Sequence, residues 1–499
     1  MATEISRRAV RKQRHSWIVI LSVLLLLTWF GTSIFSRAQQ TPAPANFQHV
    51  IVIFQENRTP DNLFYGLCSP PYGTADSCSP IPNANQYDIQ TNNWLDKASP
   101  NGVIQPEPVP LANSYDLSHA HSAFVAQCDL NSSGACRMDG AVGVACSGTC
   151  PPTPQFKYVD NSSGILDPYL QLATQYGWAN YMFQTNQGPS FPAHQFIFGG
   201  TSAPNTVADA LGVYASENMS GPNSGVAGCI ALATTRVRLI MPDGRESQSI
   251  YPCFEHQTMA DILPPGVSWR YYAPGAGSIW TAPNAISHIC QSTGPGGKCA
   301  GTDWTDNVDL TPAHVLTQIG NCQLPSLSWV VPTGANSDHA NSNDGGGPSW
   351  VASIINAIGT STTCDGSGYW QDTAIVITWD DWGGWYDHEP PTILKAAFGN
   401  YQLGFRVPMI FVSAYTPAGY INNVRHDFGS ILRFIEHNFG LQLGALNFAD
   451  SRATTDLTAF YDLSEPPRAF QPINAPKSAS FFINDKRPAT APDDDGDDQ

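Results

Sequence analysis

Short apolar runs recur along the chain, and each is cut off by polar residues. The clearest are residues 49–54 (HVIVIF) and residues 374–378 (AIVIT). Apolar, β-branched runs of this length are typical of strands buried on both faces of a mostly parallel sheet. Three further strands are expected at residues 178–183, 327–331 and 408–413. Residues 269–272 (WRYY) predict a strand or a cleft wall.

Three segments between these runs predict helices. Residues 168–176 have helical spacing and are followed by Gly177, and residues 427–439 are followed by Gly440. Glycine after a helix is a common C-cap signal. The third helix is expected at residues 350–358, after a glycine-rich break. Strands that alternate with helices predict one large α/β domain, a mostly parallel sheet flanked by helices, with long loops.

The two clearest strands both end in oxygen ligands. Glu56 and Asn57 follow the first, and Asp380 and Asp381 follow the second. In a parallel sheet such ends can lie side by side, where binding sites form. Adjacent carboxylates repel each other unless a cation holds them, and this set suits Ca²⁺ or Mg²⁺ more than zinc. A simple turn is the alternative for Asp380 to Gly383, since Asp and Gly are ordinary turn residues.

Other candidate residues lie in loops between the predicted elements. Ser190 sits in GPSFPAH, where it could open a helix, and the helix dipole and a nearby cation would favour its alkoxide. A turn or N-cap role is the alternative. His119 and His121 would face one side of an extended segment, or lie exposed in a loop. His339 follows the predicted strand at residues 327–331.

The N-terminus predicts export. Residues 1–38 combine a basic start, an apolar run at residues 17–35 and small residues before Gln39, as a cleaved signal does. An uncleaved anchor is the alternative, because a membrane span needs about 20 residues. A Pro/Ala linker follows at residues 39–47. We therefore expect a periplasmic or secreted protein, or one anchored by residues 17–35.

The charge argues against nucleic acid as a partner, and the cysteine content agrees with export. The 499 residues carry a net charge of −17, and residues 1–38 hold six Lys/Arg and one Glu, so the remainder carries −22. Such a chain lacks the basic patches that nucleic acids require. All twelve cysteines lie in the exported part, and their even number predicts disulfides. Three pairs are close enough to staple loops: Cys68/Cys78, Cys146/Cys150 and Cys290/Cys299.

Seven blocks, in order along residues 48–445, resemble the bacterial phosphoesterase family, which includes C-type phospholipases and a type of acid phosphatase. The first block is HVIVIFQENRTPDNLFYG at residues 49–66. The others are residues 116–121, GPS with Pro192, residues 269–272, SDH at residues 337–339, WDDxGG at residues 379–384, and RVP at residues 406–408 with the helix at residues 427–440. The resemblance implies an alkaline-phosphatase-like fold.

The resemblance also implies roles for individual residues. One divalent cation would be held by oxygen ligands: Glu56, Asn57, Ser190, Asp380 and Asp381. Ser190 would attack phosphorus and become a transient phosphoserine. Three histidines would bind phosphoryl oxygens or protonate the leaving alcohol: His119, His288 and His339. His194 stands where members commonly carry Arg, and neither the residues nor the resemblance assigns roles to His121, His194, Asp387 or His388.

These implications predict a phosphoric-ester hydrolase acting on small phosphomonoesters, as an acid phosphatase does. The alternative is a phospholipase C that contacts membrane surfaces and cleaves phosphatidylcholine-like lipids; a second alternative is a non-catalytic surface binding protein. Four aromatic residues near the paired carboxylates could form an exposed lipid-binding rim or simply pack in the core: Trp379, Trp382, Trp385 and Tyr386. We expect the catalytic domain at residues 48–465 and a tail at residues 466–499, acidic and disordered at its end.

Overall fold

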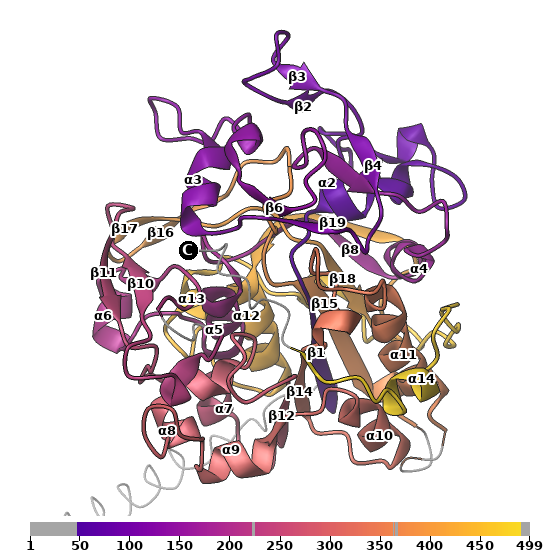
Figure 1. Cartoon of the computed structure of the whole chain (residues 1–499). Helices are drawn as coiled ribbons and strands as arrows, with labels where there is room; N and C mark the ends of the chain where they lie inside the picture. Colours follow the sequence, from indigo (N-terminus) through magenta and orange to yellow (C-terminus); the bar gives the residue numbers. More distant parts are fainter. Residues whose placement is uncertain (1–46, 222–224, 363, 365–367, 491–499) are drawn as a thin grey trace, which may run out of the picture. The chain divides into compact units, whose positions relative to one another are not determined.

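The apolar runs form an eight-stranded sheet in the computed structural model (Figure 1). Its order is β13 (Val308–Asp309), β12 (Trp269–Tyr272), β14 (Leu327–Val330), β1 (His49–Gln55), β15 (Thr373–Trp379), β18 (Met409–Val412), β8 (Gly177–Phe183) and β19 (Tyr420–Asp427). All neighbours pair parallel except β18, which is antiparallel to both β15 and β8. The predicted mostly parallel α/β sheet is confirmed.

The structure describes residues 47–221, 225–362, 364 and 368–490. The predicted signal and most of the linker, and the acidic end of the tail, lie outside these residues. By its contacts the chain from Asn46 onward forms one unit. Within the described part, none of the helices is both long and apolar enough to cross a bilayer.

Strands β1 and β15 lie at the centre of the sheet and pair along their whole length. Their register runs from His49 opposite Thr373 to Gln55 opposite Trp379. From Val50 to Gln55 and throughout β15 the side chains are buried. Because the strands are parallel and end at the same level, the residues that follow them must emerge together at one edge of the sheet.

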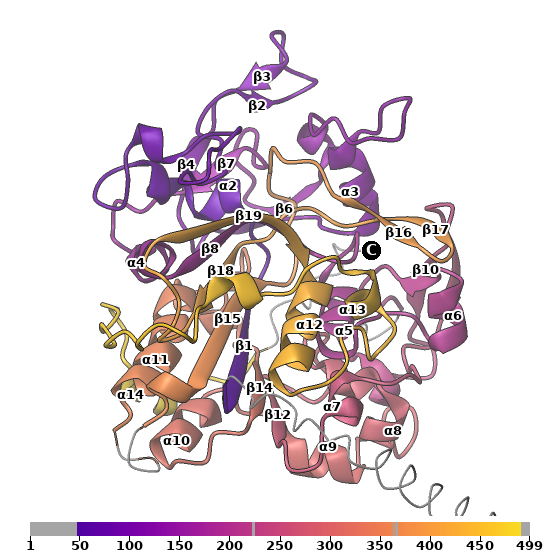
Figure 2. The ribbon, with the colours of Figure 1, turned by 180° about the vertical axis from the view of Figure 1, so that it is seen from behind.

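Helices cover both faces of this central pair (Figures 1 and 2). One layer contains α4 (Asp167–Gln175), α10 (His314–Gly320), α11 (Gly347–Thr360) and α14 (Ala479–Ile483). The other contains α5 (Ser190–Gly199), α7 (Met259–Ile262), α12 (Phe428–Asn438) and α13 (Ala449–Arg452). The three predicted helices are therefore present as α4, α11 and α12, and each presents an apolar face to the core.

One predicted helix end is wrong. The α4 helix stops at Gln175, but Gly177 does not cap it in a left-handed conformation; it is the first residue of β8. A side chain at Gly177 would bring a Cβ within 2.6 Å of the Phe460 ring. Glycine is therefore needed at this position so that the Phe460 ring can pack against the backbone of β8. By contrast, Gly440 follows α12 with a φ of 70°, as predicted.

Loops and short elements surround the sheet. Residues 56–160 lie beyond the edge where β1 ends (Figure 1). They hold α2 (Pro60–Leu63), α3 (His121–Cys128) and three two-stranded pairs: β2 (Trp94–Leu95) with β3 (Val103–Ile104), β4 (Glu107–Val109) with β7 (Lys157–Val159), and β5 (Tyr115–Leu117) with β6 (Cys146–Gly148). Elsewhere lie α6 (Thr206–Ala210), α8 (Ser287–Cys290), α9 (Thr302–Asn307), β9 (Tyr214–Ala215), β10 (Val237–Ile240), β11 (Glu246–Ile250), β16 (Ile393–Ala396) and β17 (Gly399–Gln402).

Six disulfides staple these loops and use all twelve cysteines. The three predicted pairs are confirmed. The other three are Cys128–Cys136, Cys229–Cys253 and Cys322–Cys364. This density of disulfides is typical of an exported protein.

The first part of the predicted tail, residues 466–490, packs against the domain. Phe482 on α14 packs against Trp350 of α11, with ring centroids 5.3 Å apart. Phe470 packs against Trp370 at 4.9 Å. The sequence shows no periodic pattern here, because isolated aromatic side chains make these contacts and there is no repeating apolar face. Residues 466–490 therefore belong to the packed unit, and the acidic stretch beyond them lies outside the described residues.

A buried network of ion pairs locks the loops that follow β1 and β15. The Arg406 guanidinium lies 2.9 Å from Asp88 and 2.8 Å from Asp387. His388 lies 2.7 Å from Asp61 and 3.1 Å from Asp88. All five residues are buried or nearly so. The network gives structural roles to Asp387 and His388, which the sequence leaves unassigned.

The carboxylates around His388 favour the charged form of its ring. Burial alone would lower its pKa, but the Asp61 carboxylate and then Asp88 outweigh burial and raise the pKa from 6.5 to about 10. Because the folded pKa lies above the unfolded one, His388 stabilises the fold fully below pH about 6.5. That contribution is lost as the pH rises through about 10.

We therefore expect the His388→Gln variant to be least stable relative to the parent at pH 6. The difference in the free energy of unfolding should shrink steadily toward pH 10, since the parent loses the charged ring. Denaturant titrations across this range measure it. The His314→Gln variant is the control, because His314 is half-exposed and its pair with Asp309 is worth little. A His388 difference that does not change with pH would contradict the assignment.

Candidate active site

The ends of β1 and β15 bring four predicted oxygen ligands together. Glu56 and Asn57 follow β1, Asp380 and Asp381 follow β15, and all four are fully buried. The backbone N–H of Asn57 donates to Asp380 Oδ1 at 3.1 Å. The backbone N–H of Arg58 donates to the carbonyl oxygen of Asp381 at 3.0 Å. These bonds extend the strand pairing beyond the sheet and fix the carboxylates relative to each other.

Ser190 joins this group from helix α5. It is the first residue of the helix, as predicted, and its hydroxyl donates to Asp381 Oδ2 at 3.2 Å. The next N–H, that of Phe191, donates to Asn218 Oδ1. Gly188 is needed two residues earlier, because a Cβ there would lie 1.9 Å from the carbonyl oxygen of Ser216. The hydroxyl is thus held at a helix N-terminus and beside a carboxylate.

His119 and His339 lie close together at the same edge of the sheet. Their ring centroids are 5.9 Å apart. Nδ1 of His119 donates to the carbonyl oxygen of Leu117 at 2.9 Å, so its Nε2 accepts from Asn57 Nδ2 at 3.0 Å. The same Nε2 is 4.0 Å from Asp381 Oδ2. Nδ1 of His339 donates to the carbonyl oxygen of Ala340, and its buried Nε2 makes no hydrogen bond to any described residue.

Asp338 positions the His339 segment. Its Oδ2 accepts hydrogen bonds from Tyr169 Oη at 2.8 Å and Trp379 Nε1 at 3.0 Å. Its carbonyl oxygen accepts from the Arg58 guanidinium at 2.7 and 3.0 Å. Complete burial raises the pKa of Asp338 to about 6, although Arg58 acts to lower it. The loop after β14 is therefore tied to both central strands.

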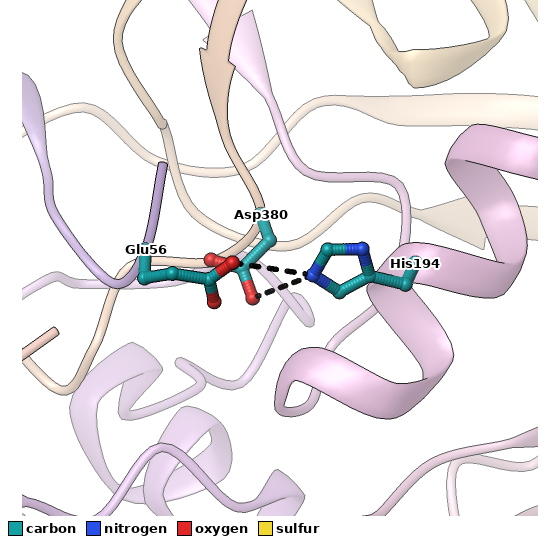
Figure 3. Close-up of side chains that lie close together, drawn as sticks. All are labelled: Glu56, His194 and Asp380. Carbon is teal, nitrogen blue, oxygen red and sulfur yellow. Dashed lines mark ion pairs between the residues drawn. The ribbon is translucent and has the colours of Figure 1, made fainter. Parts of the chain in front are cut away.

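His194 is the member of this group to which the sequence assigned no role (Figure 3). It lies one turn after Ser190 on α5, and its Nε2 is 3.3 Å from Glu56 Oε1 and 3.7 Å from Asp380 Oδ2. Burial lowers the pKa of His194 to about 4, with Asp380 acting in the opposite direction. The i, i+4 spacing from Ser190 on the predicted helix is the signal that would have found it.

Two other histidines lie elsewhere. The resemblance implied a catalytic His288, but both its ring nitrogens contact carboxylates outside this group, Glu255 at 2.8 Å and Asp261 at 3.0 Å. The hydrogen bond to Asp261 is the main cause that raises the pKa of His288 to about 9. His121 is buried on α3, and its Nδ1 donates to the carbonyl oxygen of Gln187.

The aromatic residues near the paired carboxylates do not form an exposed rim. Each of the four side chains is fully buried: Trp379, Trp382, Trp385 and Tyr386. Trp382 donates its Nε1–H to Gln127 and stands edge-on to the His119 ring. Of the two readings that the sequence left open, core packing is the one observed.

The oxygen atoms of the site fit a divalent cation. Asn57 Oδ1 and Asp380 Oδ2 are buried and accept no hydrogen bond from the described residues. Buried polar atoms without partners are costly, and a cation would satisfy them. One atom each from Glu56, His194 and Asp380 also lies within 4.8 Å of the others. A cation bound here would polarise a phosphoryl oxygen and neutralise charge.

Known proteins with similar sequences are phosphoesterases. A model of the Phosphoesterase family matches residues 47–442, in agreement with the resemblance seen in the sequence. Phospholipase C A of Mycobacterium tuberculosis is 21% identical over 90% of this chain and 84% of its own length. Hemolytic phospholipase C of Pseudomonas aeruginosa is 22% identical over 83% of this chain and 56% of its own length. A solved protein of the alkaline phosphatase superfamily from Vibrio parahaemolyticus is similar at a TM-score of only 0.30, with 9% identity over 60% of this chain and 64% of its own.

The turn after Asp381 yields a test of the site. Gly383 has a φ of 63°, and a Cβ there would lie 2.4 Å from the carbonyl oxygen of Asn57. Gly383→Ala should push the two strand ends apart and lower phosphoester hydrolysis about 10²-fold, as misplacements of about 1 Å do. Gly102→Ala is the matched control, since Gly102 has a φ of 72° and open space around it. Equal activity of the two variants would show that the approach of the strand ends is unimportant.

Proposed function

The chain belongs to the Phosphoesterase family, and we propose that it is an exported, metal-dependent phosphoric-ester hydrolase that uses Ser190 as its nucleophile. The observation that carries this proposal is the position of Ser190 Oγ, at the N-terminus of α5 and 3.2 Å from Asp381 Oδ2. A hydroxyl becomes a nucleophile when a base accepts its proton and positive charge stabilises the alkoxide. Asp381 and the helix N-terminus supply both.

The reaction has two steps. In the first, Ser190 Oγ forms a bond to phosphorus, its proton passes to Asp381, and the leaving alcohol departs with a proton from a histidine. In the second, water attacks phosphorus and gives a proton to the same histidine, while Asp381 returns its proton to Ser190 Oγ as the Oγ–P bond breaks and phosphate leaves. We assign His119 and His339, in their protonated forms, to the phosphoryl oxygens and the leaving alcohol, because Nε2 of His119 lies 4.0 Å from Asp381 Oδ2 and the two rings are 5.9 Å apart. We assign no catalytic role to His288, which is paired elsewhere.

The metal would be held by Glu56, Asn57, Asp380, Asp381 and the Ser190 hydroxyl. Carboxylate and amide oxygens alone suit Ca²⁺ or Mg²⁺. A metal in contact with Ser190 would also lower the pKa of the hydroxyl. The complete ligand set and the adjacent nucleophile argue against a non-catalytic binding protein on this fold.

Small phosphomonoesters are the substrates that we propose first. Ser190, Asp381 and His119 are fully buried, which suits a small phosphoryl group better than a lipid. A phospholipase C activity on a choline phosphodiester is the second candidate. It is favoured by the names of the relatives that match most of the chain, and it requires contact with a membrane surface.

The test is hydrolysis of p-nitrophenyl phosphate against p-nitrophenyl phosphorylcholine by the purified protein, with and without a chelator. We expect faster, chelator-sensitive release from the monoester. Ser190→Ala should lower this rate at least about 10³-fold, as loss of a nucleophile does. Ser132→Ala is the control, since this serine lies exposed in a disulfide loop.

Preference for the choline diester, still dependent on Ser190, would move the substrate to the phospholipase class. Ser190→Ala with full activity would refute the nucleophile. A folded, metal-supplied protein without activity on either ester would contradict both substrate proposals.

A further inference from the structure

Helix α5 presents two functional side chains on one face. Ser190 and His194 are four residues apart, so they lie one above the other. Figure 3 shows that the His194 ring extends from α5 toward the carboxylates of Glu56 and Asp380, which come from two different strands. The helix that carries the proposed nucleophile therefore also places an imidazole nitrogen within the proposed metal-binding group.

The hydrogen bonds around His194 define its tautomer. The Tyr271 hydroxyl donates its one hydrogen to the carbonyl oxygen of Trp280 at 2.8 Å. The 3.3 Å contact between Tyr271 Oη and His194 Nδ1 must then be a hydrogen bond donated by Nδ1–H. In the neutral ring this leaves a lone pair on Nε2, and Nε2 is the atom that faces Glu56 and Asp380.

The two contacts of Nε2 with carboxylates are longer than charge-assisted hydrogen bonds. A charged imidazole that donates to a carboxylate lies about 2.7–2.9 Å from the oxygen. Here the distances are 3.3 Å to Glu56 Oε1 and 3.7 Å to Asp380 Oδ2, and Nε2 makes no hydrogen bond within the described part of the chain. Three fully buried side chains thus place one ligand atom each around a common centre, within 4.8 Å of one another. A cation at that centre resolves the repulsion.

We propose that His194 is a direct ligand of the catalytic cation, through Nε2, together with Glu56 and Asp380. This inference rests on the metal-dependent hydrolase proposed above and changes the class of its metal. Imidazole binds Ca²⁺ and Mg²⁺ poorly and suits first-row transition metals, whereas carboxylates accept both kinds. The set therefore selects a transition-metal dication such as Zn²⁺ over the Ca²⁺ or Mg²⁺ that the oxygen ligands alone suggest.

Tyr271 would not touch the cation but would hold the His194 ring through its other nitrogen, Nδ1. Histidines that bind metals usually donate their other N–H to a neighbouring acceptor, which fixes the ring orientation. The Tyr271 hydroxyl is such an acceptor and is itself held by Trp280. Removal of an outer partner typically lowers metal affinity about 10- to 100-fold, and removal of a direct ligand should cost at least as much.

The test is metal binding by the full protein after chelation, measured by titration calorimetry with Zn²⁺, Mg²⁺ and Ca²⁺. We expect Zn²⁺ to bind most tightly. His194→Gln should weaken Zn²⁺ at least about 100-fold and Tyr271→Phe about 10-fold. Ca²⁺ and Mg²⁺ should change little in either variant. His314→Gln, with a half-exposed histidine paired to Asp309, is the control and should bind like the parent.

A spectroscopic readout can be made first on the parent protein. In the Co²⁺-loaded parent, a histidine ligand gives a hyperfine-shifted NMR signal from its exchangeable N–H, which disappears in D₂O. The proposal predicts one such signal, from Nδ1–H of His194, that is absent in His194→Gln and moved in Tyr271→Phe.

Preference for Ca²⁺ or Mg²⁺, or a Co²⁺ spectrum without the exchangeable signal, would overturn the role of His194. It would leave the hydrolase intact provided that Ser190→Ala is inactive. If Zn²⁺ binds tightly through His194 but the Ser190→Ala variant still hydrolyses esters, the role of His194 would stand and the role of Ser190 as nucleophile would be wrong. No binding of any of the metals by folded protein would refute both proposals.

Discussion

The parallel pairing of β1 with β15 is the constraint on which the site depends. Seven residue pairs hold the two strands in register, so the chain brings Glu56 and Asp380 to one edge although more than three hundred residues separate them. The hydrogen bond from the Asn57 N–H to Asp380 then prevents the ends from separating. Acidic side chains that would repel each other in a flexible chain are held together by backbone bonds formed elsewhere.

The fold contains two buried groups of acidic residues, one around Arg406 and one around Glu56 and Asp380, and their charges are compensated differently. Around Arg406, the carboxylates of Asp88 and Asp387 are matched by a guanidinium, and His388 adds a second positive charge. Asp61 also belongs to that group, whose carboxylates are all paired within the chain, and the group works as a structural lock. Around Glu56 and Asp380, His194 lies at 3.3 and 3.7 Å, and burial favours the neutral form of its ring. The contrast marks the second group as the place where an external cation is needed.

Helix α5 connects this electrostatic centre to chemistry. Its first residue supplies the hydroxyl, and its fifth supplies an imidazole whose orientation depends on Tyr271. A rigid helix holds both side chains with greater precision than a loop would. The proposed nucleophile, the proposed proton acceptor Asp381 and the residues that would hold the metal are therefore fixed relative to one another before a substrate arrives, as phosphoryl transfer requires.

Much of this was visible in the sequence because it depends on local patterns. Buried strands appear as apolar runs, and the polar residues that follow them could be placed at one edge by the rule for parallel sheets. The sequence could not show contacts that depend on packing. Gly177 has the sequence position of a helix cap, but in the fold it allows close packing against Phe460. The residues next to Arg406 in the sequence do not indicate that it pairs with Asp88. The sequence assigned no role to His194, because its contacts are with Glu56 and Asp380, which lie far from it along the chain.

The central claim is that Ser190 forms a covalent bond to phosphorus. It is tested most directly by mixing the metal-loaded protein with excess p-nitrophenyl phosphate, quenching in acid within the first turnovers, and mapping phosphorylated peptides by mass spectrometry. Acid preserves a phosphoserine while stopping its hydrolysis by the enzyme. The account predicts a phosphate on Ser190 that is absent from unreacted protein. Turnover without phosphate on Ser190, or with phosphate on another residue, would contradict it.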